Sequence, residues 1–177
     1  MATADLRWLS KYIRDIPDFP AAGVIYKDIT PLLAEPVAFG AAVEALSDYF
    51  APEAPSKVFG LEARGFIVGA PVAYRLGAGF VPVRKKGKLP HTVKGTEYQL
   101  EYGFERLEVH TDGVEQGESV LVIDDVLATG GTAVAAIDLV ELLGGTLVGV
   151  GVLVELSYLK GRERLPGRDV RSLMRFE

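Results

Sequence analysis

Apolar and polar positions along the chain follow two alternating patterns. Four short runs are almost wholly apolar and rich in β-branched residues, namely 57–61, 79–84, 120–123 and 146–156. Such runs are typical of strands that are covered on both faces of a sheet. Apolar residues instead recur at steps of three and four over 36–50, 66–76 and 131–143, which predicts amphipathic helices. Strands that alternate with helices predict an α/β fold with a doubly wound, mainly parallel sheet.

The amino-terminal region has a weaker pattern. Apolar residues recur at helical spacing over 4–15, so we predict an amphipathic helix that ends towards Pro17. Residues 18–31 are bounded by prolines and are irregular. One interpretation of this segment is a loop packed by its own apolar residues. The other is a flap over a planar ligand, with Ile25 and Tyr26 contacting a ring.

A basic segment interrupts the second half of the alternation. Residues 84–103 hold five of the 19 lysines and arginines, among glycines and a proline. The segment is too irregular for a helix or strand and long for a simple connection, which favours a mobile lid loop over a solvated basic hairpin. Beyond it, residues 104–110 alternate acidic and apolar side chains and predict an outer or edge strand, and residues 170–176 predict a last strand.

Composition narrows the class of protein. With 177 residues, 49% hydrophobic and 24% charged, the chain 1–177 is most simply one soluble globular domain. No apolar stretch is long enough to span a bilayer, and the amino terminus lacks the apolar core of a signal peptide, so no membrane is expected as a partner. The absence of cysteine excludes disulfides and fits a cytoplasmic protein. A net charge of −5 argues against nucleic acid as a partner.

The candidate chemistry lies in residues 120–132, V-L-V-I-D-D-V-L-A-T-G-G-T. An apolar strand leads to Asp124 and Asp125, and a small-residue turn then precedes a helix, which places the turn at the carboxyl edge of a sheet. The turn consists of Ala128, Thr129, Gly130, Gly131 and Thr132. Its glycine N–H groups, threonine hydroxyls and helix amino end favour a phosphate. The acids would repel that phosphate, so they should bind ribose hydroxyls or a hydrated Mg²⁺.

This string resembles the phosphoribosyl pyrophosphate (PRPP) motif of type I phosphoribosyltransferases, and no P-loop sequence is present. Five further segments between about 18 and 164 resemble adenine phosphoribosyltransferases, in that family's order: D-F-P-x-x-G-V-I-Y-K-D-I-T-P, G-L-E-A-R-G-F, V-R-K-x-G-K-L-P, Y-x-L-E-Y-G and V-E-L-x-x-L-K-G-R-E. The resemblance implies the type I fold, with an N-terminal helix and base-binding flap (hood) in 1–35 and a lid loop in 84–103. It also implies transfer of a phosphoribosyl group from PRPP to adenine, which yields AMP and pyrophosphate in purine salvage, within a homodimer.

The same resemblance implies roles for individual residues. Asp124 and Asp125 should hold the ribose hydroxyls, residues 128–132 should bind the 5-phosphate, and Glu101 on the lid is the candidate general acid or base. Pyrophosphate should be bound by Ala63, Arg64, Arg84 and Lys88, with Arg84 reaching into the neighbouring subunit. Adenine should lie between Ile25, through its backbone, and Tyr26, through stacking. Mg²⁺ is expected as the cofactor, carried mainly by PRPP and pyrophosphate without a dedicated protein ligand.

Two other functions compete with this one. The first is the same transfer to hypoxanthine, guanine, xanthine or orotate, because base choice depends on few contacts. The second is a PRPP-sensing regulator that keeps the fold without the catalysis. Regulators of that kind usually carry an added nucleic-acid-binding part, for which this sequence shows neither spare length nor a basic surface signal.

Overall fold

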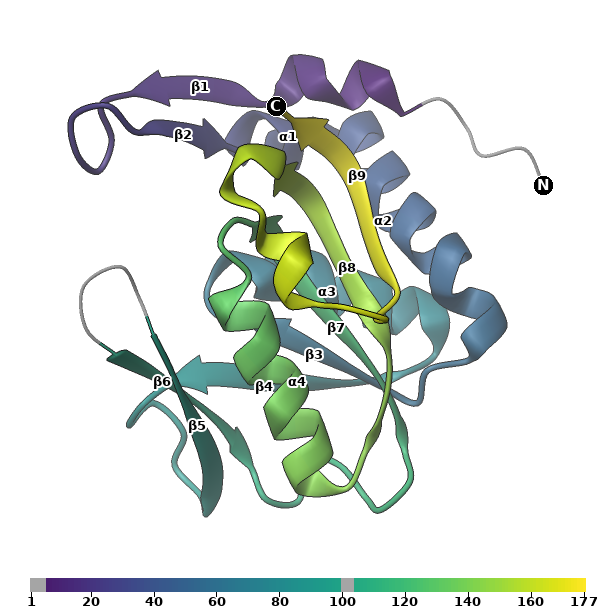
Figure 1. The fold of residues 1–177 in the computed structure, drawn as a ribbon. Helices are drawn as coiled ribbons and strands as arrows, with labels where there is room; N and C mark the ends of the chain where they lie inside the picture. Colours follow the sequence, from purple (N-terminus) through teal and green to yellow (C-terminus); the bar gives the residue numbers. More distant parts are fainter. Residues whose placement is uncertain (1–5, 100–103) are drawn as a thin grey trace.

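The computed structural model describes residues 6–99 and 104–177, and a seven-stranded sheet forms its centre (Figure 1). The strand order is β5-β6-β4-β3-β7-β8-β9. Their bounds are β3 Lys57–Leu61, β4 Gly79–Lys85, β5 Val93–Gln99, β6 Phe104–His110, β7 Ser119–Leu127, β8 Thr146–Leu156 and β9 Val170–Phe176. Strands β4, β3, β7, β8 and β9 are parallel, whereas β6 and β5 pair antiparallel at one side. The predicted doubly wound, mainly parallel sheet is confirmed.

Helices cover both faces of this sheet and enclose two apolar cores. Helix α4 (Gly131–Leu143) lies on one face, and helices α2 (Pro36–Phe50) and α3 (Arg64–Leu76) lie on the other, as Figure 1 shows. Apolar side chains of β7 alternate between the two cores, with Val120 and Val122 towards α4 and Leu121 and Ile123 towards the opposite face. This explains why the run is apolar at every position: a strand covered on both faces has no solvent side. No helix in the described ranges has the length and apolarity needed to cross a membrane.

The shorter elements connect the layers. A helix α1 precedes α2, and four short 3-10 helices complete the described part of the chain: α1 Thr30–Ala34, η1 Arg7–Tyr12, η2 Ala51–Glu53, η3 Ser157–Leu159 and η4 Gly161–Arg164. Gly77 and Gly144 follow α3 and α4 in the left-handed region, which ends each helix.

The predicted amino-terminal helix over 4–15 is wrong. Between residues 6 and 17, only η1 is helical, and β1 (Arg14–Pro17) then pairs antiparallel with β2 (Ile25–Asp28). A helix this short is marginally stable in water, and pairing with a second strand satisfies the same backbone groups. The hairpin of β1 and β2 extends beyond the body of the molecule (purple in Figure 1). Lys27 holds it in place through Asp15, 2.7 Å away, and through the ring of Phe176.

The basic segment 84–103 is not the irregular loop that its composition predicted. Its residues 93–99 form strand β5, which pairs with β6 along its whole length, so this part of the segment is a regular strand. The strand has few apolar residues to signal it, and its partner β6 is a separate segment of the chain, so local pattern could not reveal it. The edge strand on this side of the sheet is therefore β5, and β6, which was predicted as an outer or edge strand, is the second strand from the edge.

Candidate active site

A pocket of about 620 Å³ opens at the carboxyl edge of the sheet. Its walls come from the β1–β2 hairpin, the β3–α3 turn, the end of β7, the β5–β6 hairpin and the segment after β8. Among the lining residues are eight that the sequence singled out: Ile25, Tyr26, Ala63, Arg64, Asp124, Asp125, Ala128 and Thr132. Segments far apart in the sequence thus bring most of the predicted site residues to one cavity, at the edge where α/β sheets bind ligands.

The turn between β7 and α4 presents its backbone donors at this edge. Strand β7 continues past both acids to Leu127, and α4 begins at Gly131, so residues 128–130 form the connection. Gly130 has a φ of 82°, a left-handed conformation that glycine adopts without strain. Among the described residues, no hydrogen bond is formed by the N–H groups of residues 129–132. These donors, together with the amino end of α4, are available to an anion.

The two acids at the end of β7 are in different environments. Asp125 is almost fully buried, and its Oδ2 lies 2.6 Å from Nε of Arg64. Asp124 accepts a hydrogen bond from the backbone N–H of Asp125 at 2.9 Å. Burial and the neighbouring carboxylate of Asp125 raise the pKa of Asp124 well above its ordinary value. Both carboxylates border the pocket.

The turn between β3 and α3 supplies a cation to the same cavity. The peptide bond between Glu62 and Ala63 is cis. Arg64 follows as the first residue of α3, and its guanidinium lies 5.0 Å from the centre of the Tyr26 ring. Arg64 thus contacts both Asp125, the acid on β7, and Tyr26, the aromatic residue of the hairpin.

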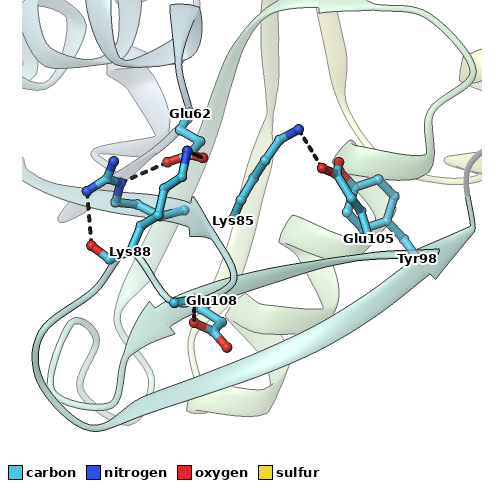
Figure 2. A network of polar contacts seen from close by, with 8 residues as sticks. Glu62, Lys85, Lys88, Tyr98, Glu105 and Glu108 are labelled. Carbon is cyan, nitrogen blue, oxygen red and sulfur yellow. Dashed lines mark hydrogen bonds and ion pairs between the residues drawn. The ribbon is translucent and has the colours of Figure 1, made fainter.

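Two further cations meet on the carboxylate of Glu62, whose side chain is only 4% exposed. Nε of Arg84 and Nζ of Lys88 each lie 2.8 Å from one of its oxygens, and Arg84 also donates to the carbonyl of Lys88 (Figure 2). Burial opposes ionisation, but the bonds from Lys88 and Arg84 outweigh it and lower the pKa of Glu62. Arg84 and Lys88 therefore stand beside the pocket and are held there by a residue that lines it.

A second carboxylate cluster forms the opposite wall. The Tyr98 hydroxyl donates to Glu105 at 2.7 Å, and Lys85 pairs with the same carboxylate, as Figure 2 shows. Burial, and then the bond to Glu105, raise the pKa of Tyr98 to about 12, so its hydroxyl is neutral at physiological pH. Tyr98 and Glu105 are paired directly across β5 and β6, so the cluster joins these two strands.

Comparisons with known proteins agree with this geometry. Residues 29–172 match the family described as the phosphoribosyl transferase domain. Adenine phosphoribosyltransferase of Acidothermus cellulolyticus is 57% identical over 99% of both chains. The crystal structure of adenine phosphoribosyltransferase from Rhodothermus marinus is 50% identical, with a TM-score of 0.93 over 97% of this chain and 98% of that one. The chain belongs to the adenine phosphoribosyltransferase family.

A more distant family member was solved with ligands. The adenine phosphoribosyltransferase structure from Saccharomyces cerevisiae, complexed with D-2,5-dideoxy-2,5-imino-altritol 1,6-bisphosphate and adenine, is 35% identical to this chain. Its TM-score is 0.90, with 95% of this chain and 97% of that chain covered. The architecture of adenine phosphoribosyltransferases is thus retained here over nearly the whole length.

Some residues that the resemblance assigned lie outside the main pocket or beyond the described residues. Thr129 and Gly130 border a smaller cavity of about 60 Å³ behind the turn, and Gly131 is buried at the start of α4. Glu101 lies outside the described residues. Within the described ranges, no group of three or more His, Asp or Glu side chains could hold a metal ion.

The structure also adds pocket residues that the sequence analysis did not assign. Tyr158 and Leu159, in η3 after β8, line the cavity beside the hairpin residues. Lys85, Tyr98 and Glu105 line it from the β5–β6 side. The motif V-E-L-x-x-L-K-G-R-E contains Tyr158 and Leu159 and could have indicated them as pocket residues. Two apolar residues after a strand, however, are equally typical of residues packed in the core.

Proposed function

We propose that this protein transfers the 5-phosphoribosyl group of PRPP to adenine, giving AMP and pyrophosphate, at the pocket on the carboxyl edge of the sheet. The observation that carries this proposal is the turn 128–132. Its unengaged backbone donors lie directly after Asp124 and Asp125 and beside an aromatic-lined cavity. Such a site provides for a phosphate, vicinal hydroxyls and a planar base at once. Family membership supports the choice of adenine.

The sugar-binding part of the reaction falls to β7 and the turn. Backbone N–H groups of residues 129–132 and the hydroxyls of Thr129 and Thr132 bind the 5-phosphate. Asp124 and Asp125 accept hydrogen bonds from the ribose hydroxyls and stabilise the positive charge that develops on the ribose as the C1–O bond to pyrophosphate breaks. The ion pair between Asp125 and Arg64 supports this role, because it orients the carboxylate at the pocket before substrate arrives.

Departing pyrophosphate is bound by the cations around the β3–α3 turn. The backbone of Ala63 and the side chains of Arg64, Lys88 and Arg84 stabilise its growing negative charge. In the described structure, Glu62 holds Lys88 beside the pocket, so little reorganisation is needed for Lys88 to contact the anion. Arg84 pairs with the same carboxylate and in this proposal acts on the pyrophosphate of the neighbouring subunit. Preorganised donors of this kind are most effective once a closing segment excludes water, a role we assign to the lid in 84–103.

Adenine occupies the part of the pocket beneath the β1–β2 hairpin. Tyr26 stacks on the base and Ile25 contacts it through its backbone, with Tyr158 and Leu159 on the opposite wall. The half-exposed Ile25 and the edge-on contact between Tyr26 and Phe19, with ring centres 5.2 Å apart, support a hydrophobic slot for a planar ring. Glu101 acts as the general acid or base at the purine.

Mg²⁺ is the cofactor that we assign to this reaction, and it enters bound to PRPP. The residues present fit such a metal: oxygen donors at Asp124 and Asp125 border the pocket, while no described cluster offers a complete protein-made site. When present, such a metal would neutralise part of the charge of the leaving pyrophosphate. The protein residues then need only position the complex and exclude water.

We further propose a homodimer in the cytoplasm, built from one domain over 1–177, with residues 1–35 and 84–103 as hood and lid. Exposed apolar side chains on one stripe of α3 support a dimer, since Ile67 is 46% and Tyr74 is 90% exposed. Arg84 lies near the carboxyl end of β4 and reaches the neighbouring subunit in this proposal. The measured mass in solution tests the dimer directly.

The activity is tested by pyrophosphate release. Purified protein is incubated with PRPP and Mg²⁺ and with adenine, hypoxanthine, guanine, xanthine or orotate in separate reactions. Release with adenine alone supports the proposal. Release with another base would assign the pocket to that base, and release with none, despite PRPP binding, would favour a PRPP-sensing regulator.

A further inference from the structure

A buried ion pair lies directly behind the phosphate-binding turn, outside the pocket. Glu155, near the carboxyl end of β8, has a side chain that is 7% exposed. Both of its oxygens accept hydrogen bonds from Arg162 in η4, at 2.8 Å from Nε and 2.6 Å from Nη2. This two-bond geometry fixes the guanidinium in orientation as well as position. The Arg162 hydrogen bonds are the chief reason why the pKa of Glu155 falls to about 2.

The remaining donors of Arg162 attach it to the neighbouring strand. Nη1 donates to the carbonyl of Val170 at 2.8 Å, and Nη2 also reaches Oγ of Ser172 at 3.2 Å. Ser172 in turn donates to Glu155 at 2.6 Å. One side chain therefore fastens the segment between β8 and β9 to both strands.

The residue before Arg162 is pressed against the phosphate-binding turn. A Cβ atom on Gly161 would overlap the carbonyl oxygen of Ala128 and come within 2.9 Å of the backbone nitrogen of Gly130. In the reverse direction, a Cβ atom on Gly130 would lie 2.5 Å from the carbonyl oxygen of Gly161. The two backbones are thus in direct contact, without room for even a methyl group on either side.

We propose that the Glu155–Arg162 pair positions the phosphate-binding turn by holding the backbone of Gly161 against Ala128 and Gly130. Glu155 and Arg162 are positioning residues in this arrangement, since neither touches the substrate. The inference rests on the proposed function, in which residues 128–132 bind the 5-phosphate. This role explains why a two-bond arginine–carboxylate pair occurs here. Apolar packing alone would hold the segment after β8 in place but would not fix its distance from the turn.

The same segment also forms part of the base pocket. Tyr158 and Leu159 precede Gly161 by only a few residues and line the main cavity. The Glu155–Arg162 pair therefore fixes the position of the base-site wall formed by Tyr158 and Leu159 relative to the phosphate-binding turn. Loss of the fastening should weaken phosphate binding first, because the contact with the turn is the closer one.

The test compares binding of ribose 5-phosphate, measured by calorimetry, across variants of the full-length protein. We expect Arg162→Met and Gly161→Ala to weaken binding about tenfold, equivalent to about 1.4 kcal/mol. Arg162→Lys should bind as weakly as Arg162→Met, because an ammonium cannot form the two-bond fork. Arg175→Met is the matched control: Arg175 also lies 3.2 Å from Glu155, but it is on β9 and does not carry Gly161. It should bind within twofold of the parent.

Kinetics separate positioning from general destabilisation. The KM for PRPP should rise in the Arg162 and Gly161 variants more than kcat falls, while thermal unfolding remains cooperative. Gly161→Ala does not change the Arg162 side chain itself, so it tests the contact between Gly161 and the turn even if Arg162→Met does not fold. Parent-like binding in Gly161→Ala, or an equal loss in Arg175→Met, would overturn the positioning role. Failure of the parent itself to bind ribose 5-phosphate would instead overturn the proposed function.

Discussion

Replacing Glu155 with glutamine should lower the stability of the protein in a strongly pH-dependent way. Glu155 is the carboxylate that accepts two hydrogen bonds from Arg162 and one from Ser172, and it lies 3.2 Å from Arg175. Glutamine has nearly the same shape but no charge, so Glu155→Gln removes the ion pair with little change in packing. The loss therefore reports the removal of the carboxylate charge, which leaves Arg162 without its anionic partner.

The magnitude follows from the pKa of Glu155. Hydrogen bonds from Arg162 lower it from an ordinary value of 4.5 to about 2. Each factor of ten in proton affinity corresponds to about 1.36 kcal/mol, so the ionised form contributes about 3 kcal/mol to the free energy of unfolding at pH 7. Because the folded-state pKa is the lower one, this contribution is complete above about pH 4.5 and disappears as the pH falls towards 2. Near pH 3 about half of it should remain.

Urea unfolding followed by circular dichroism, at pH 7, 5, 4 and 3, measures this dependence. The difference in unfolding free energy between the parent and Glu155→Gln should be about 3 kcal/mol at pH 7 and about 1.5 kcal/mol at pH 3. Glu141→Gln is the control, because its pair with Arg168 joins two side chains that are 54% and 42% exposed and should contribute well under 1 kcal/mol. A Glu155→Gln difference below about 1 kcal/mol at pH 7, or one that is the same at pH 3, would refute the reasoning.

Three further variants test the assigned roles through pyrophosphate release. Asp125→Asn should lower turnover more than tenfold while thermal unfolding remains cooperative, and full activity would remove Asp125 from the catalytic set. Glu101→Gln should also lose more than tenfold, since an amide cannot exchange a proton with the purine; an unchanged pH–rate profile at normal turnover would count against it. Glu62→Gln should raise the KM for PRPP several-fold and change the KM for adenine less than twofold, because it releases Arg84 and Lys88. An equal rise in both KM values would contradict that assignment.

Local pattern predicted the elements whose neighbours are fixed by burial. Strands β3 and β8 and helices α2 and α4 follow from continuous apolar runs or helical spacing, because each strand contributes to both cores and each helix packs against one of them. Strand β7 runs further than its apolar residues indicated, since the acid Asp124 still pairs with Val152 of β8. The acidic residues show where the side chains of β7 leave the apolar core, but the backbone pairing of β7 with β8 continues to Leu127.

Features that depend on distant partners were not predictable in the same way. Strands β1, β2 and β5 exist because each pairs with a neighbour, and their sequences carry little apolar alternation. The pairing of Glu62 with Arg84 and Lys88 joins two turns that are adjacent only in the folded sheet. The motif at 120–132, by contrast, could be interpreted from the sequence, because its chemistry is contained in one strand, one turn and one helix start.

The most direct test of the account is a crystal structure of this protein with AMP bound. The account predicts that the 5-phosphate accepts hydrogen bonds from the N–H groups of residues 129–132, that the ribose hydroxyls donate to Asp124 and Asp125, and that the adenine ring stacks on Tyr26. A phosphate bound elsewhere, with those N–H groups still unengaged, would contradict it.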